Sequence, residues 1–194
     1  MKIINLFTIK TFPRIDSKLI NNFQYLKLFR DQLKCQQLPQ LLYRATRDSF
    51  SFTSFHEKCD NHFKVVIIVK SQDGDLFGGF TTQNLKSENN QYFSGIRDED
   101  SFTFRFEQDE LHLFKLKPQF YNSALLRYFS NYLVVFGYMF WIGEHSNINP
   151  SVSSTHPSIE VSIEPQCLLK GEERRYFGGF KFNVEELEVF KILQ

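Results

Sequence analysis

The sequence has few cysteines and almost no net charge. The first argues against a disulfide-rich protein, and the second argues against a nucleic-acid-binding protein. Three cysteines, Cys35, Cys59 and Cys167, occur among 194 residues, and none form a C-x-x-C pair. A disulfide framework is therefore not expected, and a reducing compartment is the simpler interpretation. The formal net charge is +1, so no strong field of one sign is available to bind nucleic-acid phosphates.

Sequence motifs of several common enzyme classes are also missing. No glycine loop is followed by Lys and Ser or Thr, which excludes a P-loop for nucleotide phosphates. The chain contains neither a G-x-S-x-G nucleophile elbow nor an H-E-x-x-H zinc motif. We therefore predict that the protein is not an enzyme and needs no cofactor.

Long apolar runs are absent as well. None approaches the roughly 20 residues of a membrane helix. The start, MKIINLFTIK, resembles a secretory signal only loosely, because Lys10 interrupts the apolar run and no small-residue cleavage site follows. We predict an intracellular soluble protein, cytoplasmic or part of the cytoskeleton or a cilium; a mitochondrial location is less favoured, since the start lacks the Ser and Arg content of a transit peptide.

Phenylalanine, by contrast, is abundant, with 23 of 194 residues, and favours an aromatic-rich packed core. Residues 64–70 (KVVIIVK) are nearly all apolar and β-branched, which predicts a central strand buried on both faces. Asp73-Gly74 predicts a tight turn into a return strand at 75–82. Further strands are predicted at 41–43, 101–106, 111–116, within 131–143, and at 159–163, 177–182 and 186–192. The pattern predicts a mostly β (α+β) fold, a two-sheet antiparallel β-sandwich flanked by short helices.

An N-terminal arm and an amphipathic helix, residues 1–37, precede the main domain of residues 38–194. Asp16 and Ser17 can cap a helix that runs to about residue 34. Its apolar positions form one stripe: Leu19, Phe23, Leu26, Phe29 and Leu33. The stripe either packs on the domain's own sheet or docks on a partner. The arm itself contains apolar residues that we predict to contact a partner: Ile3, Ile4, Leu6, Phe7 and Phe12.

Two glycine pairs, Gly78-Gly79 and Gly178-Gly179, each lie between phenylalanines in the sequence FGGF. Their flanking sequences, DLFGGFTT and RYFGGFKF, do not extend the similarity, so they do not indicate an internal duplication. Glycines inside strands allow close approach of another backbone or a large ring. We predict that all four glycines are structural.

Taken together, several segments resemble the TLDc domain, the module of the oxidation-resistance protein family. The matching pieces are LLYRATRD at 41–48, FHEKCDN at 55–61, VVIIVKSQDGDLFGGFT at 65–81, SFTFRF at 101–106, VFGYMFWIGEHSN at 135–147 and FGGFKFNVEELEVFKI at 177–192. The family often has several glycines where this chain has bulky residues at 136–140, which disfavours an open pocket there. The resemblance implies a β-sandwich that contacts other proteins, protection against oxidative stress, and binding to the vacuolar proton-pumping ATPase (V-ATPase).

A histidine and cysteine cluster on a predicted helix at 53–59 is the first candidate for chemistry. His56, Cys59 and His62 form H-x-x-C-x-x-H, but His62 lies beyond the Asp60-Asn61 helix stop. A structural zinc needs four ligands, and Cys35, His156 and Cys167 could complete a set only through folding. His56 could instead activate the Cys59 thiol, although burial on the inner helix face would make the thiol inert. Metal binding and thiol chemistry are both less favoured than a core role.

Paired carboxylates are the second candidate. Glu186 and Glu188 lie on one face of a predicted strand, because side chains alternate along it. They form either a solvated or salt-bridged face or a recognition patch that contacts a partner; acid–base catalysis by such a pair is the enzyme alternative. We predict a non-catalytic module that docks on a large multisubunit assembly, as a structural subunit or as a regulator of V-ATPase.

Overall fold

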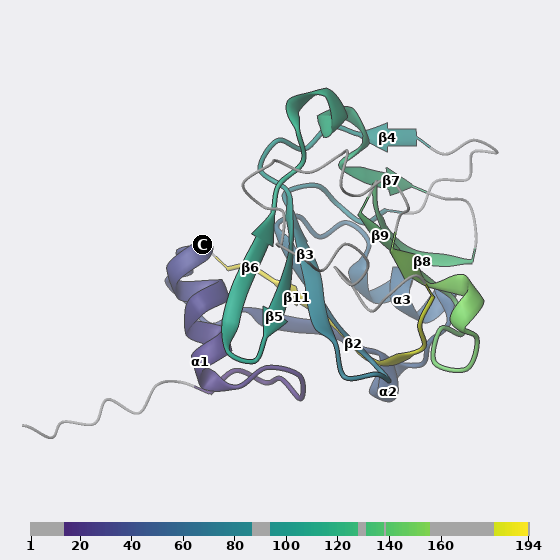
Figure 1. Cartoon of the computed structure of the whole chain (residues 1–194), viewed down its shortest axis with the longest axis horizontal. Helices are drawn as coiled ribbons and strands as arrows, with labels where there is room; N and C mark the ends of the chain where they lie inside the picture. The colour runs from purple at the N-terminus through teal and green to yellow at the C-terminus, as the bar shows by residue number, and fades with distance from the viewer. Residues whose placement is uncertain (1–13, 87–93, 128–130, 138, 156–180, 194) are drawn as a thin grey trace, which may run out of the picture.

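The computed structural model describes residues 14–86, 94–127, 131–137, 139–155 and 181–193. Its strands form antiparallel sheets (Figure 1). The largest sheet has six strands in the order β1-β11-β2-β3-β5-β6; a second has three, β10-β9-β8, and β4 pairs with β7. This mostly β architecture with few short helices confirms the predicted fold class.

The elements are short throughout. The six-stranded sheet contains β1 (Gln40–Arg44), β2 (Val65–Ser71), β3 (Leu76–Thr81), β5 (Phe102–Glu107), β6 (Glu110–Phe114) and β11 (Val184–Lys191). The smaller sheets contain β4 (Ser94–Ile96), β7 (Leu125–Arg127), β8 (Tyr132–Phe136), β9 (Phe140–Gly143) and β10 (Ser154–Thr155). The helices are α1 (Asn22–Tyr25), the π-helix η1 (Leu26–Gln32), α2 (Ala45–Asp48), α3 (Phe52–Cys59), and the 3-10 helices η2 (Pro118–Ser123) and η3 (Pro150–Val152).

Strand β2 lies inside the large sheet and is buried on both faces, as predicted. Val65, Ile67 and Val69 point into a core shared with β8 and β9, whereas Val66 and Ile68 point toward the N-terminal helix. All five side chains are fully buried. Each contributes on the order of 1.5–3 kcal/mol by its removal from water, which makes β2 the centre of the fold.

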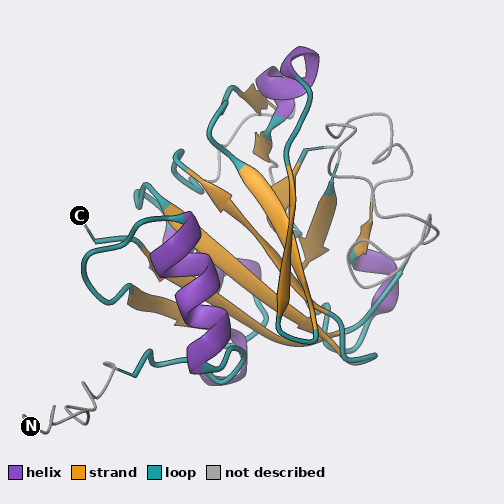
Figure 2. Ribbon diagram, turned by 60° about the vertical axis from the view of Figure 1, so that its left-hand side comes forward, coloured by secondary structure: helices purple, strands orange, loops and turns teal. Residues whose placement is uncertain are grey.

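The N-terminal helix, α1 with η1, covers one face of the six-stranded sheet (Figure 2). Leu28 and Phe29 are fully buried there, and the Phe29 ring meets the edge of Phe190 in β11 at a centroid distance of 5.8 Å. The opposite face packs against the sheet of β8 and β9. The helix therefore packs on the domain's own sheet, which is the first of its two predicted roles.

The predicted start of this helix is wrong, whereas its apolar stripe is confirmed except at Phe23. The helix begins at Asn22, and its N-cap is Asn21, whose side chain accepts from the amides of Phe23 and Gln24 while the Gln24 side chain accepts from the Asn21 amide. This capping box satisfies the first amides of the helix, whereas Ser17 Oγ accepts from the amides of Leu19 and Ile20 ahead of it. Leu19, Leu26, Phe29 and Leu33 pack against the core beneath the helix, and Phe23, in its first turn, is 51% exposed.

Predictions for the turns agree well with the structure. Gly74 has φ +93° in the turn between β2 and β3, and Gly137 has φ +36° between β8 and β9. The Ser-, Asn- and Pro-rich segment at 146–155 contains η3 and β10, and β10 pairs with β9. The strands predicted at 159–163 and 177–182 lie outside the described residues, except for the end of the second.

None of the helices in the described part of the chain has the length and apolar character that crossing a membrane requires.

Candidate functional site

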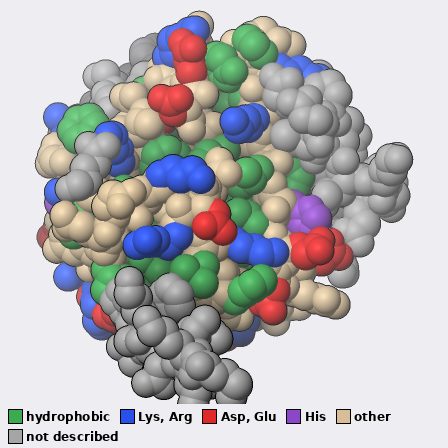
Figure 3. All heavy atoms as spheres, turned by 90° about the vertical axis from the view of Figure 1, so that its left-hand side faces the viewer, with side chains coloured by type: hydrophobic (Ala, Val, Ile, Leu, Met, Phe, Trp, Pro, Cys, Tyr) green, Lys and Arg blue, Asp and Glu red, His purple; other side chains and the backbone are tan. Residues whose placement is uncertain are grey.

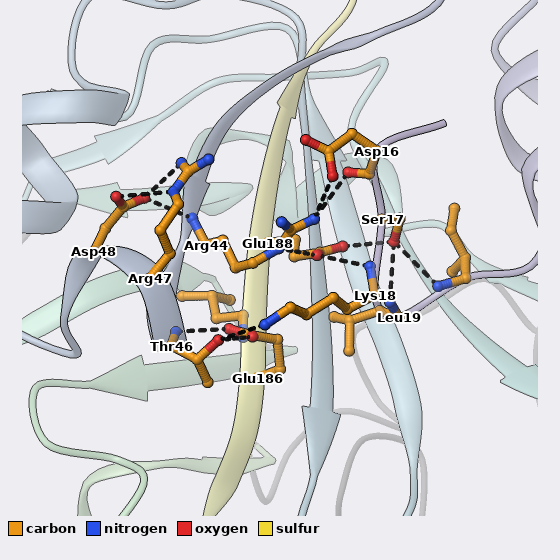
Figure 4. Close-up of polar contacts among 12 residues, drawn as sticks. Asp16, Ser17, Lys18, Leu19, Arg44, Thr46, Arg47, Asp48, Glu186 and Glu188 are labelled. Carbon is orange, nitrogen blue, oxygen red and sulfur yellow. Dashed lines mark hydrogen bonds and ion pairs between the residues drawn. The ribbon is translucent and has the colours of Figure 1, made fainter. Parts of the chain in front are cut away.

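A polar cluster joins the N-terminal segment to β1 and β11 (Figure 4). Arg44, the last residue of β1, stands at its centre. Its Nε donates to Glu188 Oε1 at 2.7 Å, and its Nη2 donates to Asp16 Oδ1 at 2.9 Å and to the Asp16 carbonyl at 3.0 Å. Burial opposes the charge of Arg44, but the hydrogen bonds to Asp16 and Glu188 outweigh it and raise the pKa of its guanidinium. The cluster therefore holds a permanent cation between two carboxylates.

Glu188 is the fully buried member of the cluster. Besides Arg44, it accepts from Ser17 Oγ at 2.6 Å and from the Lys18 amide at 3.0 Å. A buried carboxylate is tolerated when a cation and hydrogen-bond donors satisfy it. Glu188 thus fixes the segment that leads into the N-terminal helix onto β11, the strand next to the edge strand β1.

Glu186 is also buried, with 4% exposed. Its carboxylate accepts from the Thr46 amide at 2.9 Å, from Thr46 Oγ1, and from the Leu187 amide at 3.1 Å. Glu188 is thus salt-bridged to Arg44, one of the predicted alternatives, and neither glutamate is solvated. The prediction of a recognition patch is corrected, because both carboxylates are engaged within the chain. The reason is that β11 lies between β1 and β2, with its polar face covered by residues 16–20 and α2.

Asp48, at the end of α2, neighbours the cluster. Burial works against its charge, but hydrogen bonds from Arg47 and from the Arg44 amide lower the pKa of its carboxyl, with help from Lys58 at 3.5 Å. Asp48 therefore contributes stability above its unfolded pKa, and this contribution is lost as the pH falls below about 4.

We expect an Asp48→Asn variant to lose less stability on acidification than the parent protein. Above pH 5 the variant should be the less stable of the two, and the gap in free energy of unfolding should close as the pH falls toward 2. Urea denaturation at several pH values measures it. Asp73→Asn, in an exposed turn, is the matched control and should shift the curve little; a gap that stays constant with pH contradicts the assignment.

Burial determines the chemistry of the cysteine and histidine cluster on α3. Cys59 is fully buried, and burial, followed by the nearby Asp60 and Asp48 charges, raises the pKa of its thiol well above the ordinary value. His56 Nδ1 lies 2.6 Å from Asp60 Oδ1, so this ring nitrogen is hydrogen-bonded to the Asp60 carboxylate and not to the Cys59 thiol. Among the residues that the structure describes, no group of three His, Cys, Asp or Glu side chains could hold a metal. His156 and Cys167 lie outside the described residues, and Cys35 is buried.

Gly78 and Gly79 allow the close approaches that were predicted for them. A Cβ on Gly78 would meet the Ile67 carbonyl and lie 2.7 Å from Phe104 Cζ, whereas a Cβ on Gly79 would meet the Phe136 ring, with Cε1 at 2.6 Å. Gly78 thus faces the helix side of the sheet and Gly79 the second sheet. Gly178 and Gly179 lie outside the described residues, as do the arm residues Ile3, Ile4, Leu6, Phe7 and Phe12.

Three bulky residues, Phe136, Met139 and Phe140, occupy the region in which a glycine-rich turn would leave space. Phe136, Met139 and Phe140 are all buried. An adjacent internal space of about 10 Å³, lined by Thr103, Phe114 and Phe136 among others, has room for about one water molecule. It is too small for an organic ligand.

Asp98 has a structural role that no sequence pattern predicted. This aspartate is 3% exposed and accepts from Thr81 Oγ1 at 2.7 Å, from the Thr82 amide at 2.8 Å and from Thr82 Oγ1 at 2.9 Å. It ties the end of β3 to the loop before β5. Two adjacent threonines at the end of a strand are a weak signal for such an acceptor, but an acidic run such as RDED is typical of a surface loop.

The fold and the cluster define a β-sandwich domain in which the charged side chains of the core fix a covering helix to its sheet. The family model for the TLDc domain matches residues 14–193. The chain therefore belongs to the TLDc domain family. That match takes in the N-terminal helix as well as the segments on which the resemblance was based. No curated protein matches the chain.

Proposed function

We propose that this protein is a non-catalytic TLDc-type interaction module that docks on a large multisubunit assembly. The observation that supports the proposal is that the charged and thiol side chains of the site are buried and bonded within the chain. Arg44 and Glu188 pair with each other, Glu186 accepts from Thr46, and Cys59 is fully buried in the core. Side chains that are bonded in this way stabilise the fold. We therefore expect the domain to act through contacts made by its surface.

The described surface is suited to protein contacts rather than to a polyanion. On the face seen in Figure 3, acidic and basic side chains are interspersed with hydrophobic ones. Phe23, Phe63 and Ile148 are more than half exposed. The apolar arm residues, Ile3 to Phe12, come immediately before the segment that Glu188 holds on the sheet, which attaches the arm to the domain at a defined point.

Two kinds of assembly fit this proposal. In one, the protein is a structural subunit of a cytoskeletal or ciliary complex; in the other, it regulates V-ATPase and contributes to oxidative-stress resistance. Gentle affinity purification of the tagged protein at its native level, with mass spectrometry of the co-eluting proteins, distinguishes them. Cytoskeletal or ciliary proteins in fixed ratio support the first, and proton-pump subunits support the second. A monomer without partners contradicts both.

We expect deletion of residues 1–13 to weaken partner binding and to change the melting temperature by less than about 2 °C, because every described contact remains. Deletion of residues 1–18 should lower the melting temperature by at least about 4 °C. Burial of Ile15 alone contributes about 1.5–3 kcal/mol, and the bonds to Glu188 are also lost. Differential scanning calorimetry and co-purification measure the two effects. Full partner binding by the chain without residues 1–13 excludes the arm as the docking element.

A further inference from the structure

The Ser17 hydroxyl connects the N-terminal segment to a buried charge. Its Oγ donates to Glu188 Oε2 at 2.6 Å and accepts from the amides of Leu19 and Ile20 at 3.0 and 3.1 Å. On either side, Ile15 and Ile20 are buried in the core beneath the helix. The hydrogen bond from the Ser17 hydroxyl to the Glu188 carboxylate therefore helps to hold residues 15–20 on the sheet.

The charged groups bonded around Ser17 do not favour a further anion. In the described cluster Arg44 is the cation bonded to Glu188, and it is shared with Asp16, so two carboxylates face one guanidinium. The Lys18 ammonium points away to Thr46 Oγ1, at 3.4 Å. A phosphate group, which carries a charge of about −1.5 to −2 at pH 7, would face Glu188 at hydrogen-bond distance.

The local sequence is suited to a protein kinase. Arg14 lies three residues before Ser17, and Arg14, Asp16 and Lys18 are exposed in a segment without helix or strand. Basophilic serine kinases bind extended substrates with an arginine at this position. We propose that Ser17 is a phosphorylation site and that its modification releases residues 14–20 from the sheet. This proposal does not depend on the proposed docking function, because its consequences are measured within the chain.

The chemistry balances with ATP as the phosphoryl donor. A bond forms between Ser17 Oγ and the γ-phosphorus, the bond from that phosphorus to the bridging oxygen breaks, ADP leaves, and the hydroxyl proton passes to the kinase's base. The kinase captures Ser17 during local opening of this segment, which contains neither helix nor strand. Once modified, Oγ no longer donates to Glu188, and repulsion between the phosphate and the carboxylate opposes reclosure.

Hydrogen exchange on the full chain with phosphoserine encoded at position 17 tests the release. We expect the amides of Lys18, Leu19 and Ile20, which bond to Glu188 and Ser17, to exchange at least tenfold faster than in the unmodified chain. Phosphoserine at the exposed Ser151 should leave these rates unchanged, Ser17→Ala should give a smaller increase, and phosphatase treatment should restore protection. Unchanged rates overturn the proposal; so does loss of protection throughout β2, which would mean global unfolding rather than release.

Kinase treatment tests whether Ser17 is a substrate. The full chain, incubated with a basophilic serine kinase and ATP, should incorporate phosphate at Ser17, as located by peptide mass spectrometry. Arg14→Ala should slow incorporation at least tenfold. Absence of phosphate at Ser17, or equal rates with and without Arg14, overturns the assignment of the site.

Discussion

Replacement of Arg44 by alanine is expected to destabilise the protein by roughly 3–5 kcal/mol, because it leaves the fully buried Glu188 carboxylate without its cation. The Ser17 and Lys18 donors remain, but two neutral donors do not offset a buried charge. Asp16, which is largely exposed, can turn to water once Arg44 is gone. Urea denaturation of the full chain, followed by far-UV circular dichroism, measures the loss.

A control and a double variant separate the buried charge from other effects. Arg97→Ala breaks an ion pair with Glu99 in which both side chains are more than half exposed, and it should cost less than about 1 kcal/mol. Arg44→Met combined with Glu188→Leu should be more stable than Arg44→Ala alone, since no uncompensated charge is left in the core. If Arg44→Ala costs no more than Arg97→Ala, the cluster does not hold the segment on the sheet.

The second large effect is expected at the glycine pair of β3. Gly79→Ala should cost about 1–3 kcal/mol, because the new Cβ overlaps the Phe136 ring. Gly78→Ala should cost more, because its Cβ meets the Ile67 carbonyl, and backbone cannot move aside as a side chain can. The same denaturation experiment ranks the two variants.

Second-site changes test this difference directly. Phe136→Leu should partly rescue Gly79→Ala, so that the double variant loses less than the sum of the two single losses. Phe104→Leu should not rescue Gly78→Ala to the same extent, since the clash with the Ile67 carbonyl remains. Additive losses for Gly79 and Phe136 would show that the ring does not limit the space.

Local patterns in the sequence were sufficient for much of the fold. The continuous β-branched run predicted that β2 is buried on both faces, and Asp73-Gly74 predicted the turn into β3, because strand burial and turn geometry depend on residues next to one another in the chain. The FGGF motif predicted close approach at Gly78 and Gly79 for the same reason. The helix start was missed because Asp16 and Ser17 cap helices as readily as Asn21 does, so composition could not choose between them.

What the sequence alone determined, then, is the β-rich class and most strand positions, which follow from short-range periodicity and glycine placement, and the family, which follows from the resemblance of its motifs. The role of Glu188 was decided only by the tertiary structure. Its partners Ser17 and Arg44 are 171 and 144 residues away along the chain. Alternating glutamates in a strand predict a solvated face wherever one face meets water. In β11 that face is covered by the N-terminal segment and α2, so both carboxylates become buried acceptors, and Glu188 holds the N-terminal segment in place.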